Sequence, residues 1–147
     1  MLPVRCQETV ADSDFRFNID LLREYCAAAL QNASELLEEA SLLFSKGHAA
    51  RAYFLAVSSI EETGKAMQAF DAQGRNLGDS AVTAKLRRAM EDHSQKITAA
   101  FTPMLLASPN IRDAVMPVVE LMVRLKHGRE PSMYTDIRYQ ERGQDCS

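Results

Sequence analysis

The sequence predicts an all-α domain, on three observations. Leucine, alanine, glutamate and methionine are abundant, whereas the 147 residues include only 6 glycines and 5 prolines, and this composition favours helices over a turn-rich β fold. Apolar residues recur at helical spacing along most of the chain. The length suits one domain that buries a core without disulfides or metal. We therefore expect one helical domain over residues 15–138, between a loose lead-in at 1–14 and a polar tail at 139–147.

The first two predicted helices form a long antiparallel αα-hairpin. The first runs from about Asn18 to Lys46, because Gly47 stands where a left-handed C-terminal cap is expected. The second begins near His48 and continues until Gly74. A connection this short makes the two helices fold back on each other. Their apolar positions are Leu22, Cys26, Ala29, Ala33, Leu36, Ala40 and Leu43, then Ala49, Tyr53, Ala56, Ile60, Met67 and Phe70.

A third helix is expected after a loop at 76–79. Ser80 is its candidate N-cap, and its apolar positions continue through Leu86 and Met90 to Ile97. Pro103 is expected to kink or end this helix, because proline removes a backbone donor and clashes with the preceding turn.

The last predicted helix opens at Ser108 and Pro109, which fit an N-cap followed by proline at the first helical position. Pro117 is expected to bend it. Beyond His127 and Gly128 the pattern becomes irregular, so we expect the helix to end there. The prediction is thus a bundle of four to five helices.

Composition and missing motifs exclude several classes of protein. The longest apolar runs, at 52–57 and 114–119, are far below the ~20 residues that cross a bilayer, and the start lacks an apolar signal core, so we expect a cytoplasmic protein without membrane partners. No Gly-rich phosphate loop, G-x-S-x-G elbow or H-E-x-x-H pair occurs, and no cofactor is expected. The cysteines form no C-x-x-C pair, which argues against a zinc site and a disulfide framework; they are Cys6, Cys26 and Cys146.

The segment from Ser58 to Lys65 places hydroxyls, paired carboxylates and a lysine in the middle of an otherwise apolar helix. One interpretation is a surface ion pair between Glu61 and Lys65, which are spaced i,i+4. A glycine inside a helix costs about 1 kcal/mol relative to alanine, so Gly64 indicates a tight helix crossing. A polar functional site is the alternative interpretation.

His93 follows Arg88 in an R-x4-H pattern, and Arg87 gives R-x5-H as an alternative. Histidine can move a proton to or from a ribose 2′-hydroxyl near neutral pH, and arginine can stabilise an anionic phosphorane without a metal. The structural alternative is that both arginines solvate a helix face. His127 with Arg124 is a second pair, at a different spacing.

The second half of the chain is the more basic one. Residues 1–74 carry 6 basic and 11 acidic side chains, and residues 75–147 carry 11 and 9, so nucleic acid would meet the second half. Basic residues there surround Tyr134, a combination that can hold a phosphate backbone and stack a base, or pack on the hairpin instead. They are Arg124, Lys126, Arg129 and Arg138.

Several blocks together resemble the AbiV family of abortive-infection proteins over residues 20–137, with the Glu-Glu-x-Gly-Lys block the most specific. They are 32–40, 52–56, 60–65, Asp92 and His93 with Lys96, and 133–136. The resemblance implies a HEPN-like bundle that shuts down growth of a phage-infected cell, through RNA cleavage or translation arrest, and that works as a homodimer. The site residues it implies are Glu61, Glu62 and Lys65, then His93 and Lys96, then Tyr134 and Asp136.

The resemblance leaves three functions open. The first is a metal-independent endoribonuclease with His93 as the proton-transfer group and Arg88 or Lys96 as the cation. In HEPN ribonucleases, however, the R-x4–6-H pair opens the last helix, whereas here it precedes that helix. The second is therefore a non-enzymatic module of the same fold that binds a phage, ribosomal or antitoxin protein. The third is a small-molecule sensor at Glu62 and Lys65.

Overall fold

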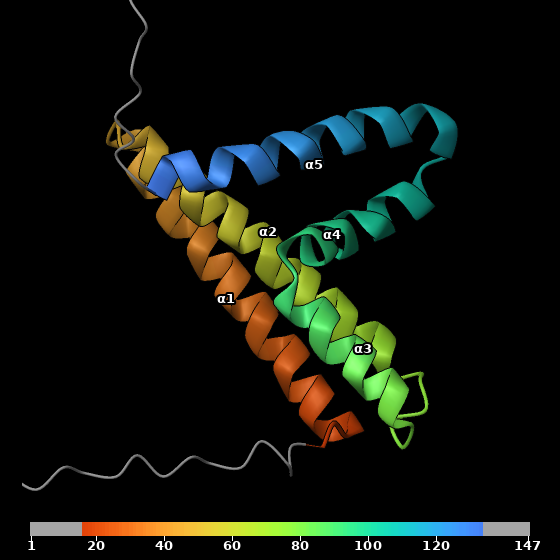
Figure 1. Ribbon diagram of the computed structural model, residues 1–147. Helices are drawn as coiled ribbons and strands as arrows, with labels where there is room; N and C mark the ends of the chain where they lie inside the picture. Colours follow the sequence, from red (N-terminus) through yellow and green to blue (C-terminus); the bar gives the residue numbers. More distant parts are fainter. Residues whose placement is uncertain (1–15, 134–147) are drawn as a thin grey trace, which may run out of the picture.

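The computed structural model describes residues 16–133, in which five helices and no strand occur (Figure 1). The predicted all-α fold with four to five helices is confirmed. The predicted lead-in at 1–14 and tail at 139–147 lie outside the described residues. The helices are α1 (Ile19–Ser45), α2 (Ala49–Ala72), α3 (Ser80–Glu91), α4 (His93–Ala107) and α5 (Ile111–Met133).

Helices α1 and α2 form the predicted antiparallel hairpin, which runs the length of the molecule (Figure 1). The Asn18 side chain caps α1 by accepting from Leu21 N at 2.8 Å, and Gly47 has the expected left-handed conformation, with φ of 81°. Small buried residues let the two helices approach closely, and Ser59 Oγ donates to the carbonyl of Ala33 at 2.6 Å. Helix α1 packs mainly against α2, and near its start Leu22 also joins a buried cluster that includes Leu86 of α3.

Helix α2 is the centre of the bundle, because it contacts each of the other four helices. One buried cluster lies toward the open end of the hairpin and combines α1, α2 and α3, and a second combines α2, α4 and α5. No helix in the described part is long and apolar enough to cross a membrane. The first cluster contains Leu22, Ala69, Ala72 and Leu86, and the second contains Val57, Ile97 and Leu125.

The prediction of one helix from Ser80 through Ile97 is wrong, because the chain breaks at Asp92. Asp92 has an extended backbone, with φ of −78° and ψ of 117°, and its carboxylate accepts from Gln95 N at 2.8 Å. Aspartate competes in this way with the backbone of a continuous helix. The break ends α3 and directs α4 across α2.

The predicted start of the last helix is wrong, and Pro103 does not end the helix that contains it. Helix α4 continues through Pro103 to Ala107, because Pro103 is exposed and a helix tolerates the missing backbone hydrogen bond best beside water. Ser108 is the C-cap of α4 rather than the N-cap of the next helix. Helix α5 therefore starts at Ile111, a few residues later than predicted.

Gly128 does not end the last helix, contrary to the prediction, since α5 continues to Met133. A Cβ atom at Gly128 would lie 2.5 Å from the hydroxyl oxygen of Tyr53. That hydroxyl donates to the carbonyl of Arg124 at 3.1 Å. The glycine therefore provides space for a tyrosine of α2 and fixes the end of α5 on the hairpin.

Candidate functional site

Two polar segments that are 32 residues apart in the sequence meet where α4 crosses α2. Glu61 comes from the middle of α2, and His93 and Lys96 come from the first turn of α4. The structure thus brings together three of the residues that the sequence singled out in separate blocks. We call Glu61, His93 and Lys96 the crossing cluster.

Gly64 makes this crossing possible, as the sequence predicted. A Cβ atom at this position would lie 1.8 Å from the carbonyl oxygen of Lys96 and 2.5 Å from its carbonyl carbon. Backbone atoms cannot move aside as a flexible side chain can, so only glycine fits here. The close approach seats the first turn of α4 directly over Glu61.

One carboxylate oxygen holds the crossing cluster together. Glu61 Oε2 lies 2.7 Å from His93 Nδ1 and 3.0 Å from Lys96 Nζ. The side chains of Glu61 and Lys96 are only 6% and 7% exposed, whereas the imidazole of His93 is 54% exposed. An ionised carboxylate only accepts hydrogen bonds, so the proton of the neutral imidazole sits on Nδ1. Nε2 is then the ring nitrogen that can accept a proton from a substrate.

Lys96 compensates the buried charge of Glu61. An isolated carboxylate in the interior loses its hydration, and a cation in direct contact offsets that cost. His93 is the first residue of α4, and Asp92 caps that helix end. The imidazole is therefore fixed both by its bond to Glu61 and by the cap that sets the direction of α4.

Glu62 and Lys65 form a separate pair beside the cluster, with side chains 17% and 24% exposed. The predicted pair of Glu61 with Lys65 is thus wrong, because Glu61 turns toward α4 while Lys65 bonds Glu62. Burial acts to lower the pKa of Lys65, but the hydrogen bond and charge of Glu62, with smaller contributions from Tyr25 and Glu61, raise that pKa above its ordinary value.

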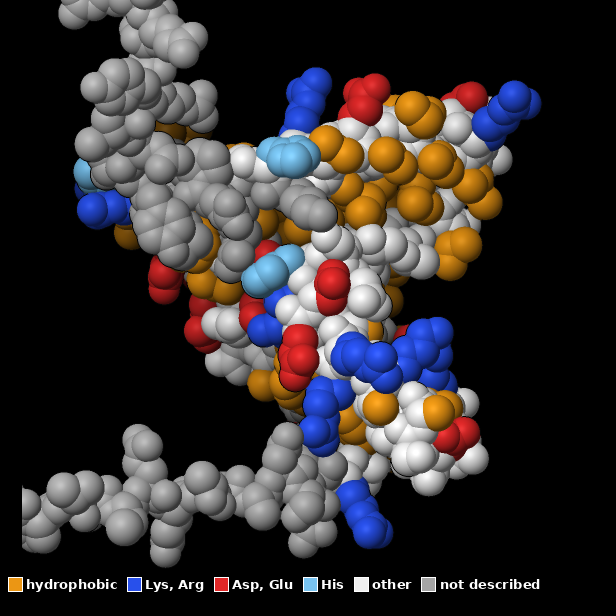
Figure 2. Space-filling view, viewed as in Figure 1, with side chains coloured by type: hydrophobic (Ala, Val, Ile, Leu, Met, Phe, Trp, Pro, Cys, Tyr) orange, Lys and Arg blue, Asp and Glu red, His pale blue; other side chains and the backbone are white. Residues whose placement is uncertain are grey.

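A cavity of about 620 Å³ adjoins the crossing cluster and is formed by the start of α1 with α2, α3 and α4. Three cations line it, namely Lys65, Arg87 and Lys96, together with the phenol of Tyr25. Arg87 also lines a neighbouring groove that includes Arg16 and Arg88. Lysine and arginine side chains gather over α3 in Figure 2. The lining of the cavity also contains the carboxylate of Glu91, and two of its three cations are paired, Lys65 with Glu62 and Lys96 with Glu61.

The other predicted site residues lie apart from this crossing or outside the described residues. Arg88 is exposed, and its Nε donates to the carbonyl of Ala84. Arg124 and Lys126 lie in α5, as does Arg129, and the side chain of Arg124 is exposed. The remaining predicted residues, which are Tyr134, Asp136 and Arg138, lie outside the described part of the chain.

Sequence reasoning missed two features of the site. It did not identify Asp92 as the helix cap that orients His93, although an aspartate three residues before Gln95 is an N-cap signal. It also missed Tyr25 and Arg87 as walls of the cavity. Tyr25 and Arg87 line the same cavity only because of how the helices pack, and no local pattern in the sequence predicts that packing.

The described residues form an all-α bundle built on a long hairpin, with a histidine held at a helix crossing. The model of one HEPN family, described as AbiV, matches residues 21–142, and the chain belongs to this AbiV family. It is therefore an abortive-infection protein of HEPN type, and the predicted HEPN-like bundle is confirmed. Neither a search of curated proteins nor a search of solved structures found a match.

Proposed function

We propose that this AbiV-family protein arrests the growth of infected cells by cleaving RNA without a metal, with His93 as the proton-transfer residue. The observation that supports it is the bond between His93 Nδ1 and the buried Glu61 at 2.7 Å, on an imidazole that is half exposed. A carboxylate that fixes the tautomer and a second ring nitrogen that faces a substrate are what general base catalysis requires.

The chemical step is an internal transfer within RNA. The ribose 2′-oxygen attacks the adjacent phosphorus while Nε2 of His93 takes the hydroxyl proton. The bond from phosphorus to the 5′-oxygen breaks, and that oxygen takes a proton from water or from the imidazolium. The products are a 2′,3′-cyclic phosphate and a 5′-hydroxyl, so no further reactant is needed.

Glu61 and Lys96 act as positioning residues in this proposal. Lys96 is buried and bonded to Glu61, so the cation that meets the phosphate comes from elsewhere. Arg88 is exposed at the end of α3, five residues before His93, and Arg87 lines the adjoining cavity. Cations of this kind stabilise the charge that develops on the phosphorane.

The test is growth arrest and total-RNA integrity in cells that express the wild type, His93→Ala, Arg88→Ala or the matched control His127→Ala. His127 is exposed on α5, away from the α2–α4 crossing. We expect RNA fragments with the wild type and the control, and a loss of about 100-fold or more with His93→Ala. Circular dichroism checks that each variant folds. Arrest with intact RNA would contradict the proposal.

We further propose that the protein works as a homodimer through the exposed apolar face of α4 and α5. Hydrophobic side chains gather over α5 in Figure 2, and a contiguous apolar surface of this kind marks an interface. A Val119→Asp variant should convert the dimer to a monomer in light scattering after size exclusion, whereas a wild-type monomer would contradict the proposal. The exposed residues are Met104, Leu106, Ile111, Met116, Val119, Leu121 and Val123.

The same face supports a second candidate function, a non-enzymatic module that binds a phage, ribosomal or antitoxin protein. Arrest that persists in His93→Ala but disappears in Val119→Asp would favour this function. Arrest lost in His93→Ala alone would favour RNA cleavage.

A further inference from the structure

A groove of about 670 Å³ lies between α3, the loop that precedes it and the residues just before α1. Three arginines line it, namely Arg16, Arg87 and Arg88, and we call it the arginine groove. Its lining also includes Phe17 and Leu77, which pack against the buried cluster of α1, α2 and α3. The groove therefore combines an apolar base with cations along its sides.

The positive charge of the arginine groove is not compensated within its lining. None of the described residues that line it is an aspartate or a glutamate. The side chains of Arg16 and Arg88 are exposed, and neither has an ion pair within residues 16–133. Arg88 Nε donates to the carbonyl of Ala84, which leaves the two terminal nitrogens of its guanidinium for a ligand.

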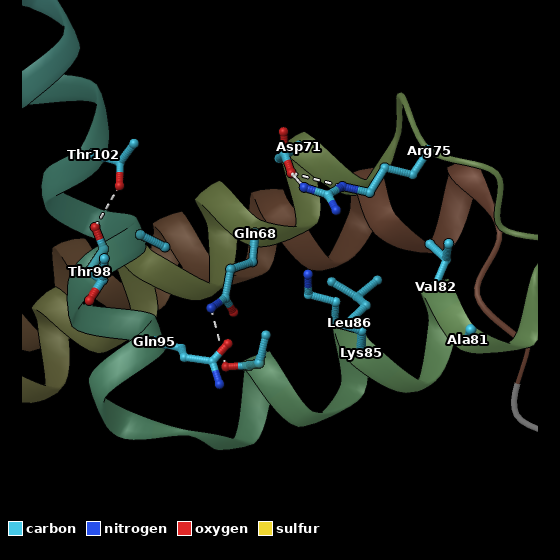
Figure 3. Close-up of a pocket in the computed structure, with 12 residues that line it drawn as sticks. Gln68, Asp71, Arg75, Ala81, Val82, Lys85, Leu86, Gln95, Thr98 and Thr102 are labelled. Atoms are coloured by element: carbon cyan, nitrogen blue, oxygen red, sulfur yellow. Dashed lines mark hydrogen bonds and ion pairs between the residues drawn. The ribbon is translucent and has the colours of Figure 1, made fainter.

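Another side of α3 has a different charge pattern, which Figure 3 shows. The groove there lies between α2, α3 and α4, and Lys85 extends into it from α3. Its lining includes the carboxylate of Asp71, which pairs with Arg75. An anion in that groove would meet a carboxylate, whereas an anion in the arginine groove would not. The arginine groove is therefore the better anion site on α3.

The arginine groove adjoins the cavity beside the crossing cluster. Arg87 lines both of them, and Lys96 of the crossing cluster lines the cavity. An extended anionic ligand can therefore continue from the groove toward His93. The volume of the groove suits about one or two nucleotides of a strand. Sites for single-stranded nucleic acid combine a cationic groove along the backbone with an apolar or aromatic surface for the bases.

We propose that the arginine groove binds the phosphate backbone of single-stranded RNA and leads the strand to His93. Arg16 and Arg88 contact phosphates, because a guanidinium matches the oxygens of a phosphate with two parallel hydrogen bonds. The bases rest on Phe17 and Leu77. This inference takes its ligand class from the proposed function, and it adds where the substrate lies and which residues hold it.

The test is the salt dependence of RNA binding by the full chain carrying His93→Ala, which removes the proposed proton-transfer residue. Fluorescence anisotropy with a labelled single-stranded RNA oligonucleotide gives the binding constant at several salt concentrations. Arg16→Ala and Arg88→Ala should each reduce the slope of its logarithm against the logarithm of salt concentration by about 0.7, the contribution of one phosphate contact. The controls Lys46→Ala and Arg51→Ala, exposed cations outside the groove, should leave the slope unchanged.

A second pair of variants tests the groove without removing an arginine. Ala84 and Ala81 are both exposed on α3, but Ala84 lines the arginine groove and Ala81 lines the groove of Figure 3. Ala84→Glu should weaken RNA binding about tenfold or more, because it places a carboxylate beside the phosphates, and Ala81→Glu should weaken it much less. Circular dichroism checks that each variant folds.

RNA binding that follows both patterns supports the proposal. Absence of RNA binding, a slope unchanged in Arg16→Ala and Arg88→Ala, or a polyglutamate peptide that binds as tightly as the RNA would overturn it. The proposed function fails separately. Binding in the groove with intact RNA in cells that express the wild type would remove the nuclease and leave the groove, and cleavage with unchanged slopes would do the reverse.

Discussion

Glu61 and Glu62 are neighbours in the sequence, yet they lie in different physical environments. Glu61 is almost fully buried and bonds His93 and Lys96 of another helix. Glu62 is partly exposed and pairs with Lys65 of its own helix. A helix turns about 100° per residue, so one of two adjacent carboxylates faces the crossing helix and the other faces outward. The comparison shows that the crossing with α4 determines which glutamate belongs to the candidate site.

The comparison predicts that the buried ion pair is the more costly to break. Lys96→Met leaves the carboxylate of Glu61 in the interior without its ammonium partner, and we expect a loss of about 3–5 kcal/mol in the free energy of unfolding. Urea denaturation measures this loss. The double variant Glu61→Gln with Lys96→Met should recover most of it, and a single variant as stable as the wild type would contradict the buried pair.

A substitution at the crossing of α2 and α4 should lower the free energy of unfolding nearly as much. Gly64→Ala puts a methyl group into the backbone of Lys96, and we expect a loss of about 1–3 kcal/mol or more. Gly74→Ala is the matched control, because a Cβ there would meet only Asp71 O, at 3.8 Å. Thermal unfolding of the two variants separates the effects, and equal melting temperatures would rule out the tight crossing.

The ion pair between Glu62 and Lys65 should contribute much less to the free energy of unfolding than the buried pair does. Glu62→Gln removes a partly exposed ion pair, which is usually worth about 0.2–1 kcal/mol. The same denaturation assay should therefore give a smaller loss than Lys96→Met does. A loss as large as that of Lys96→Met would remove the distinction between the two glutamates.

The smallest expected effect is a dependence on alkaline pH. The folded-state pKa of Lys65 lies above its ordinary value, so the stability it contributes is complete below that ordinary value and is lost as the pH rises through the folded-state pKa. The wild type should lose stability more steeply than Lys65→Met in urea titrations across the alkaline range. Identical slopes would show that Glu62 does not stabilise the ammonium.

Local patterns predicted the hairpin well, because its caps and its apolar spacing depend on residues that are close in the sequence. Asn18 caps the start of α1, and Gly47 forms the turn that follows it. Gly64 predicted a close crossing correctly, but the sequence could not say which helix crosses there. The break at Asp92 was missed, because the apolar spacing continues across it. The direction of α4, which depends on that break, was therefore not predicted. Gly128 was interpreted as a helix end, although it provides space for Tyr53, a residue 75 positions away in the sequence.

The central claim is that buried Glu61 fixes the tautomer of half-exposed His93. Nitrogen-15 NMR of the imidazoles measures this directly, and His48 and His127 serve as references within the same chain. At a pH where the ring is neutral, we expect the proton of His93 to sit on Nδ1 in the wild type. The two references should show the tautomers of a solvated imidazole. A His93 spectrum indistinguishable from theirs would contradict the claim and remove the geometric basis for proton transfer at this site.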